Sequence, residues 1–403
     1  MQKRISPLVA LTLAAISLNL TSVAWAQTEQ VIYSFTGGSD GGGPAGGVIV
    51  DAKGNLYGTT DTGGTNSAGA VFELTPNTNG TWTEKVIYSF SHLGMDGFLP
   101  YSGLTFDSKG NLYGTTLGGG SAGQGTVFEL SPGSNGTWTE QILYSFQGGT
   151  DVSSALWGDL AIDSSGNLYG ASYSGGTYQF GTVYELSPGS NGTWSEKVLY
   201  SFSGGNDGGR PLGLQLAIDA AGNLYGMTST GGPHDYGLVF ELVRGSSGNW
   251  TEKIVHAFVG GADGSSPAGS LVFDAAGNLY GPSSFSVFEL MPGSNGSWTK
   301  KEIHRFAGGS DGAFPESGLV FDKAGNLYGT TETGGAHRGT VFKLAPNANG
   351  TWTETVLHKF SSSGTDGVFP AFPALAIDAK GNLFGTTAAG GTSNAGVVFA
   401  VKP

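Results

Sequence analysis

One motif, Asp-x-x-Gly-Asn-Leu-(Tyr or Phe)-Gly, recurs along almost the whole chain and limits what this sequence can fold into. Successive copies are 56, 56, 56, 55, 48 and 56 residues apart. Self-similarity at a nearly fixed period of this length indicates a repeat architecture. The first glycines of the Gly-Asn pairs are Gly54, Gly110, Gly166, Gly222, Gly277, Gly325 and Gly381.

Each repeat contains four strand patterns separated by turn signals. The runs are rich in β-branched and aromatic residues, and an Asn-Gly pair before the fourth run is a strong hairpin signal. A four-stranded unit repeated seven times predicts an all-β, seven-bladed β-propeller with four antiparallel strands per blade. A β-helix repeats at shorter intervals, and a solenoid needs helices that are absent here. In the second copy the four runs are Leu104–Phe106, Leu112–Thr116, Thr126–Leu130 and Trp138–Phe146.

The two ends of the repeat array complement each other. The segment Val31–Phe35 matches a fourth strand, and Val397–Val401 matches a third strand with no fourth after it. We therefore expect Val31–Phe35 to complete the last blade, because closing the ring removes free sheet edges. In the fifth copy, Pro282–Ser286 replaces the usual glycine-rich loop, which predicts a tight hairpin there.

Residues 1–26 have the pattern of a secretory signal peptide. A basic start at Lys3 and Arg4 precedes an apolar run, and Ala24-Trp25-Ala26 supplies a cleavage site. The apolar run is short for a bilayer span, so a retained membrane anchor is the weaker alternative. We expect cleavage after Ala26, a secreted or periplasmic protein without membrane insertion, and one propeller domain over residues 27–403.

The net charge limits the classes of ligand that suit the protein, and the cysteine content limits how its fold can be stabilised. The formal charge of −13 becomes −15 when Lys3 and Arg4 are removed. An acidic protein is poorly suited to nucleic acid or an anionic membrane surface. The chain contains no cysteine, so an exported form relies on packing without disulfides. We expect a monomer that carries no cofactor, apart from Ca²⁺ as one option.

The repeat also resembles a known family. The combination GNLYGTT (residues 110–116), GTVFEL (125–130), NGTW (135–138) and YSF (144–146) resembles the GloVer repeat of choice-of-anchor tandem repeat proteins. The resemblance implies an exported bacterial protein. The family's C-terminal anchor segment has no counterpart before Pro403, so we expect no anchor. A looser similarity to NHL-type and gluconolactonase-like propellers concerns the fold alone.

One acidic residue recurs in the loop that leads into each repeat. Seven carboxylates on one face would supply the oxygen ligands that Ca²⁺ prefers. The alternative is structural, because Asp before Gly in a turn bonds its own backbone, and its presence in every copy favours that interpretation. The candidate metal ligands are Asp40, Asp96, Asp151, Asp207, Asp263, Asp311 and Asp366.

Residues that break the repeat are better ligand-binding candidates, since a ligand is rarely sevenfold symmetric. They gather in loops of the third and fourth copies, which are neighbours in the predicted ring. Aromatic rings with polar partners suit a glycan or peptide, whereas ordinary loop packing is the alternative. The candidate set is Trp157, Asp159, Tyr173, Tyr178, Gln179, Phe180, Arg210, His234 and Tyr236.

Signals for catalysis are weak. The sequence has no H-E-x-x-H motif and no histidine cluster at metal-ligand spacing. We therefore expect a non-catalytic interaction module at or outside the cell envelope, with a glycan or a cell-surface protein as partner. Two alternatives stay open: a metal-dependent hydrolase or lyase of the propeller type, and a structural envelope protein.

Overall fold

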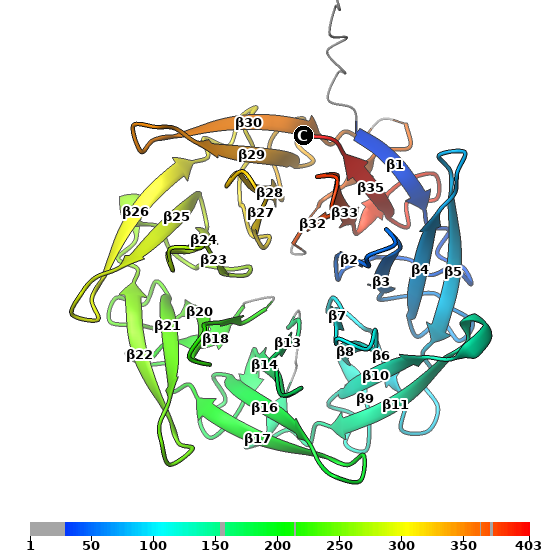
Figure 1. Ribbon diagram of the computed structural model, residues 1–403, viewed down its shortest axis with the longest axis horizontal. Helices are drawn as coiled ribbons and strands as arrows, with labels where there is room; N and C mark the ends of the chain where they lie inside the picture. Colours follow the sequence, from blue (N-terminus) through cyan, green and yellow to red (C-terminus); the bar gives the residue numbers. More distant parts are fainter. Residues whose placement is uncertain (1–28, 154–157, 213–214, 363, 371–373) are drawn as a thin grey trace, which may run out of the picture.

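A computed structural model describes residues 29–153, 158–212, 215–362, 364–370 and 374–403. Seven four-stranded antiparallel sheets stand around a central axis as the blades of a β-propeller (Figure 1). The predicted fold class is confirmed. Blades 1 to 7 follow the order of the repeats, and the first strand of each blade lies next to the axis. The predicted signal peptide, residues 1–26, lies outside the described residues.

The strands occupy equivalent positions in each blade. The first strands are β2 (Val48–Val50), β7 (Thr105–Phe106), β13 (Ala161–Ile162), β19 (Ala217–Ile218), β23 (Val272–Phe273), β27 (Val320–Phe321) and β32 (Ala376–Ile377). The second strands are β3 (Leu56–Thr60), β8 (Leu112–Thr116), β14 (Leu168–Ser172), β20 (Leu224–Thr230), β24 (Leu279–Ser283), β28 (Leu327–Thr331) and β33 (Leu383–Thr387). The third strands are β4 (Ala70–Pro76), β10 (Thr126–Pro132), β16 (Thr182–Pro188), β21 (Leu238–Arg244), β25 (Ser286–Pro292), β29 (Thr340–Pro346) and β35 (Val397–Val401). The outer strands are β5 (Trp82–Ser89), β11 (Trp138–Ser145), β17 (Trp194–Ser201), β22 (Trp250–Ala257), β26 (Trp298–Arg305), β30 (Trp352–Lys359) and β1 (Glu29–Ser34).

Short elements decorate the loops between these strands. Three two-stranded ribbons tie the loop before a blade to the loop after its second strand, and β18 adds to the edge of β20. The ribbons are β6 (Gly97–Phe98) with β9 (Gly118–Gly119), β12 (Val152–Ser153) with β15 (Ser174–Gly175), and β31 (Gly367–Val368) with β34 (Ala389–Gly390). The remaining elements are β18 (Gly209–Pro211) and two 3₁₀ turns, η1 (Ser134–Gly136) and η2 (Gly261–Asp263).

The ring closes as the sequence predicts. Strand β1 pairs antiparallel with β35, from Glu29 opposite Val401 to Ser34 opposite Val397. Figure 1 shows blue β1 beside red β35, so the two ends of the chain share blade 7. In blade 5 the tight hairpin is also present, because Ser283 pairs directly with Ser286.

The hydrophobic core lies between blades rather than within one sheet. A phenylalanine that follows each outer strand packs edge-to-face, or in two blades at a tilt, on an aromatic ring in the third strand of the next blade. Phe90 and Phe128, for example, have ring centroids 5.1 Å apart, and both are fully buried. The equivalent contact between Phe35 and Phe72, at 5.0 Å, joins blade 7 to blade 1. Each blade therefore depends on its neighbour for burial of its apolar face.

The invariant glycine of the second strand makes this packing possible. A Cβ atom at Gly114 would come 2.6 Å from the ring of Phe128. The glycine thus leaves room for the aromatic ring that lies across the strand.

Candidate functional site

The alternating strand direction divides the loops between two faces. Loops between blades and loops between second and third strands share one face, which we call the loop face. The Asp-x-x-Gly-Asn turns and the Asn-Gly turns share the opposite face, which we call the turn face. Those predicted ligand residues that the structure describes belong to the loop face and to the channel along the axis.

The structure brings three of the predicted ligand residues together. Arg210 Nη1 donates a hydrogen bond to the Tyr173 hydroxyl at 2.6 Å, and its guanidinium carbon lies 5.1 Å from the centre of that ring. The backbone nitrogen of Arg210 donates to the carbonyl oxygen of Phe180 at 2.6 Å. The Phe180 ring covers Gly204 in the same inter-blade loop, where a Cβ atom would be 2.6 Å away. This cluster therefore packs two neighbouring loops against each other.

The other loop-face candidates lie on the loops between the second and third strands of blades 3 and 4. Gln179 Nε2 donates to a backbone oxygen of the loop that precedes blade 3, at 2.7 Å. Tyr236 covers Gly260 at the next boundary, with 45 % of its surface exposed. Tyr178 is 57 % exposed, and His234 is exposed on the Tyr236 loop. Their role in binding stays a prediction.

Asp159 lies in the central channel. Its Oδ1 accepts a hydrogen bond from the backbone nitrogen of Gly103 at 2.5 Å, and burial raises the pKa of its carboxyl to about 7. Gln215 of the next blade is beside it and donates from Nε2 to the Leu160 carbonyl at 2.9 Å. Both side chains line a channel cavity of about 430 Å³. Trp157, the remaining candidate, lies outside the described residues.

The seven loop aspartates are distributed one to each blade boundary. Each accepts hydrogen bonds from its own loop, as Asp151 does from the backbone nitrogens of Gln147 (2.8 Å) and Val152 (2.7 Å). In the described part of the chain, no three of them bring carboxylate oxygens within 4.8 Å of one another. Cation binding by the set as a whole stays a prediction.

Each of these aspartates belongs to a set of three residues that we call a boundary triad. The second member is a Tyr or His near the end of the outer strand that precedes the aspartate. The third member is the third residue of the next outer strand, except in β1, where it is the first residue. The triads are Tyr33/Asp40/Glu84, Tyr88/Asp96/Glu140, Tyr144/Asp151/Glu196, Tyr200/Asp207/Glu252, His256/Asp263/Lys300, His304/Asp311/Glu354 and His358/Asp366/Glu29.

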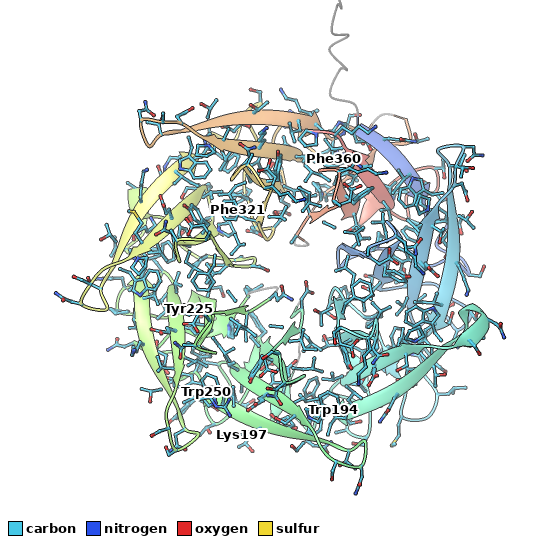
Figure 2. The ribbon with its side chains drawn as sticks, viewed as in Figure 1. Trp194, Lys197, Tyr225, Trp250, Phe321 and Phe360 are labelled. Carbon is cyan, nitrogen blue, oxygen red and sulfur yellow. The ribbon has the colours of Figure 1, made fainter. Side chains whose placement is uncertain are left out.

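The turn face contains a groove that the sequence did not indicate. It occupies about 720 Å³ at the boundary of blades 2 and 3, which places it in the size range of ligand sites. The ring of Tyr113 and the indole of Trp194 lie 6.2 Å apart in its wall, and Phe106 and Ile162 add apolar surface. Figure 2 labels Trp194 at this boundary and Trp250 at the next.

Polar side chains surround this aromatic wall. Lys109, Glu129, Gln141 and Asp163 all line the groove. Gln141 Nε2 crosses it to donate to a backbone oxygen of the Asn-Gly turn of blade 3, at 3.2 Å. The groove therefore combines flat aromatic surface with hydrogen-bond donors and acceptors, and it carries both positive and negative side chains.

Glu129 adopts a different arrangement from its equivalents. It accepts a hydrogen bond from Ser131 Oγ at 2.8 Å. In four other blades the equivalent glutamate accepts one from the tyrosine across the strand pair, at 2.8 to 3.2 Å. Its departure gives the groove at this boundary a carboxylate that is not tied to the adjacent ring. The four regular pairs are Tyr57 with Glu73, Tyr169 with Glu185, Tyr225 with Glu241 and Tyr280 with Glu289.

The electrostatics of the groove fix the protonation of two groups. Burial and the negative charge of Glu129 raise the pKa of Tyr113, so its hydroxyl remains a donor at neutral pH. Burial also acts to raise the pKa of Asp163, but hydrogen bonds from Asn167 and the backbone outweigh it and lower that pKa. Asp163 is thus an ionised acceptor.

One residue of this groove departs from the repeat, although it was not among the predicted candidates. Gln141 occupies a position that is lysine in four other repeats, which makes it a departure from the repeat on an outer strand. Glu129 carried no such signal, because the same Glu-x-Ser pattern recurs at Glu185 and Ser187, where the glutamate bonds Tyr169.

A second groove adjoins the first. It occupies about 440 Å³ at the boundary of blades 1 and 2 and includes Tyr57 and Trp138. Phe106, Asp107 and Ser108 line both grooves, so they meet at the Asp-x-x-Gly-Asn turn of blade 2. Together the two grooves form an extended surface along the turn face.

Comparison with known proteins agrees with the repeat and the fold. A family model described as the Gloeobacter/Verrucomicrobia repeat matches residues 19–156, 134–287 and 286–403. No curated protein matches the chain. Among the described residues, no helix is long and apolar enough to cross a membrane.

Several solved propellers resemble the chain in shape. Virginiamycin B lyase from Staphylococcus aureus has a TM-score of 0.53 at 12 % identity, over 93 % of this chain and 99 % of that one. A putative 6-phosphogluconolactonase from Bacteroides fragilis has a TM-score of 0.52 at 16 % identity, over 78 % of this chain and 85 % of that one. The extracellular domain of a putative hybrid two-component system from B. thetaiotaomicron has a TM-score of 0.53 at 11 % identity, over 92 % of this chain and 39 % of that one. At these identities the likeness extends to the fold alone.

Proposed function

The chain belongs to the Gloeobacter/Verrucomicrobia repeat family, and we propose that it is an exported binding module that holds a carbohydrate chain on its turn face. The observation that carries this proposal is the groove at the boundary of blades 2 and 3. Its indole of Trp194 and ring of Tyr113 offer flat apolar surface for sugar rings. Glu129, Gln141 and Asp163 offer acceptors and a donor for hydroxyl groups.

The neighbouring groove favours an oligomeric ligand. Because Phe106, Asp107 and Ser108 line both cavities, a chain of sugar units can cross the turn of blade 2 without leaving the surface. The net charge of −13 argues against polyanionic ligands. A neutral or cationic carbohydrate is therefore the best match. Export rests on the signal-peptide pattern of residues 1–26.

Binding of the purified protein to an array of envelope and extracellular glycans tests this proposal. Glu129→Gln and Gln141→Ala should each weaken binding at least about tenfold, the effect of losing one well-formed hydrogen bond to a ligand. The controls are Glu241→Gln and Lys253→Ala, at the equivalent positions two blades away, where Lys253 stands in the place of Gln141. Equal losses in the groove variants and the controls, or unchanged binding in the groove variants, would refute the site.

A second candidate function, hydrolase or lyase activity, is favoured by one observation. The carboxyl of Asp159 has a pKa raised to about 7 by burial and faces the central channel. A carboxyl with a pKa near the working pH suits general acid–base catalysis. Turnover of a bound glycan that Asp159→Asn abolishes, with groove binding intact, would establish this activity. Binding without turnover in the unmodified protein would exclude it for that glycan.

A further inference from the structure

The boundary triad between blades 6 and 7 differs from the rest in its geometry. His358 Nε2 lies 3.3 Å from Asp366 Oδ1. Together with a carboxylate oxygen of Glu29, these atoms all lie within 4.8 Å of one another, the one such group of three among the residues that the structure describes. All three side chains are partly buried. Figure 1 shows that β1, which begins at Glu29, meets β30, which carries His358, at the outer rim.

Among the described residues, no ion pair brings a permanent positive charge to this group. Glu29 Oε1 is inaccessible to solvent and has no hydrogen-bond partner. It faces a second carboxylate, Asp366, and the described structure places no Lys or Arg in an ion pair with either. Burying a carboxylate oxygen without a partner is costly. Because a His358 ring nitrogen lies within 4.8 Å of both carboxylates here, the arrangement is suited to a bound cation.

A related boundary shows that a cation fits this position. Between blades 4 and 5, the residue equivalent to Glu29 is Lys300. Its ammonium nitrogen lies 3.0 Å from Asp263 Oδ1, while His256 Nε2 lies 3.1 Å from Asp263 Oδ2. The same Asp and His positions thus surround a positive charge that the chain supplies itself. At the blade 6–7 boundary the lysine is replaced by a third potential ligand.

We propose that Glu29, His358 and Asp366 bind a divalent transition metal ion of the Zn²⁺ class. One imidazole nitrogen and two carboxylate oxygens form a three-ligand set that zinc accepts, with water as the fourth ligand. Ligand atoms around tetrahedral zinc are about 3.3 Å apart, given bonds of about 2.0 Å, and the distance from His358 to Asp366 already matches this. Ca²⁺ would require more oxygen ligands.

The position gives the metal a structural role. Glu29 is on the strand that closes the ring, whereas His358 and Asp366 belong to the previous outer strand and the loop after it. A metal ion would join the first strand of the described chain to the last complete blade. Binding to the native state alone stabilises that state in proportion to metal concentration. This site is separate from the carbohydrate grooves of the turn face.

Calorimetric titration of the untagged exported protein with ZnCl₂, after EDTA treatment, tests the proposal. We expect one Zn²⁺ per chain and a rise of at least about 2 °C in the unfolding midpoint. His358→Tyr and Glu29→Lys should abolish binding, and both should fold, because the chain has Tyr or Lys at equivalent positions of other triads. His304→Tyr is the matched control and should leave binding unchanged.

A gain of binding provides an independent test. Lys300→Glu should create a second site with His256 and Asp263 and raise the stoichiometry to two. The proposal is overturned if the unmodified protein binds no Zn²⁺. It is equally overturned if binding survives His358→Tyr, or is lost in His304→Tyr alone. A stoichiometry that stays at one in Lys300→Glu would contradict a ligand set of one Glu, one His and one Asp.

Discussion

Replacing the glutamates of the four tyrosine-containing boundary triads should make the protein more stable at alkaline pH. In the first of these triads, the carboxyl of Glu84 is half-buried, and its Oε1 has no hydrogen-bond partner. Burial, and secondarily the negative charge of Asp40, raises the pKa of Glu84 from 4.5 to about 7. The equivalent changes at the next three boundaries have the same direction and size. The variant carries Glu84→Gln, Glu140→Gln, Glu196→Gln and Glu252→Gln.

Proton linkage determines whether stability rises or falls with pH. The folded state holds the proton of each glutamate more tightly than the unfolded state does, so the unfolded state ionises first as pH rises. The stabilising contribution of the protonated form is complete below pH 4.5 and is lost as pH rises through about 7. Glutamine resembles the protonated glutamate at every pH. Wild type should therefore lose stability between pH 5 and pH 8 relative to the variant.

The size of the pKa shift determines how much unfolding free energy each glutamate changes. A change from 4.5 to about 7 corresponds to roughly 3 kcal/mol for a fully buried group. Because these carboxyls are only half-buried, solvent screening reduces this to about 1 kcal/mol each. The sites share no partner, so four changes should add to about 4 kcal/mol at pH 8. With a urea m-value of roughly 4 kcal/mol/M for a chain of this size, the midpoint should rise by about 1 M.

Urea unfolding followed by tryptophan fluorescence at pH 5 and pH 8, in EDTA, measures the effect. Lys300→Gln is a control that should change stability in the opposite direction. Lys300 donates a hydrogen bond to Asp263, so its loss should destabilise the fold by roughly 2 kcal/mol. Proton linkage through these glutamates is refuted if the quadruple variant shifts the midpoint equally at the two pH values, or does not raise it at pH 8.

Three further predictions concern the fold. Tyr184 is fully buried and its hydroxyl has no hydrogen-bond partner, and six other blades have Phe there; Tyr184→Phe should stabilise by about 1 kcal/mol in urea unfolding. Phe90→Ala should destabilise by roughly 3–5 kcal/mol in the same assay, because it removes a fully buried inter-blade contact with Phe128. Deleting residues 29–35 should expose the edge of β35, which increased dye binding and concentration-dependent aggregation would reveal.

The repeat made the fold predictable because the chain states each local rule seven times. Alternating apolar residues, a turn with an Asp cap and an Asn-Gly hairpin allow one four-stranded unit, and the incomplete copies at the two ends complement each other. Ring closure by β1 followed from the same comparison and is confirmed by its pairing with β35. The boundaries shift only slightly: the third strand of the second copy, for example, continues past Leu130 to Pro132.

The site was harder to predict, because a ligand surface depends on side-chain directions that the repeat does not encode. Departures from the repeat drew attention to the loop face, where Phe180 and Arg210 pack neighbouring loops together. Asp159 was grouped with them by sequence, but its position before a first strand places it in the channel. In the turn-face groove, Glu129 bonds Ser131 rather than the tyrosine across the strand pair, which the matching Glu-Leu-Ser-Pro sequence at Glu185 does not show.

The boundary triads connect the stability prediction to the metal proposal. Each triad that contains Glu places two carboxyls side by side at a blade boundary, where low solvent access disfavours two negative charges. At the four tyrosine-containing boundaries no cation is supplied, so a proton must relieve the repulsion, which is why the stability of the ring should depend on pH. At the fifth, Lys300 replaces the second carboxyl with a permanent positive charge. At the boundary of blades 6 and 7, His358 brings a third ligand atom within 4.8 Å of both carboxylates, and a metal ion can provide there what the proton provides elsewhere. Zn²⁺ should accordingly oppose the alkaline loss of stability only in chains that retain both Glu29 and His358.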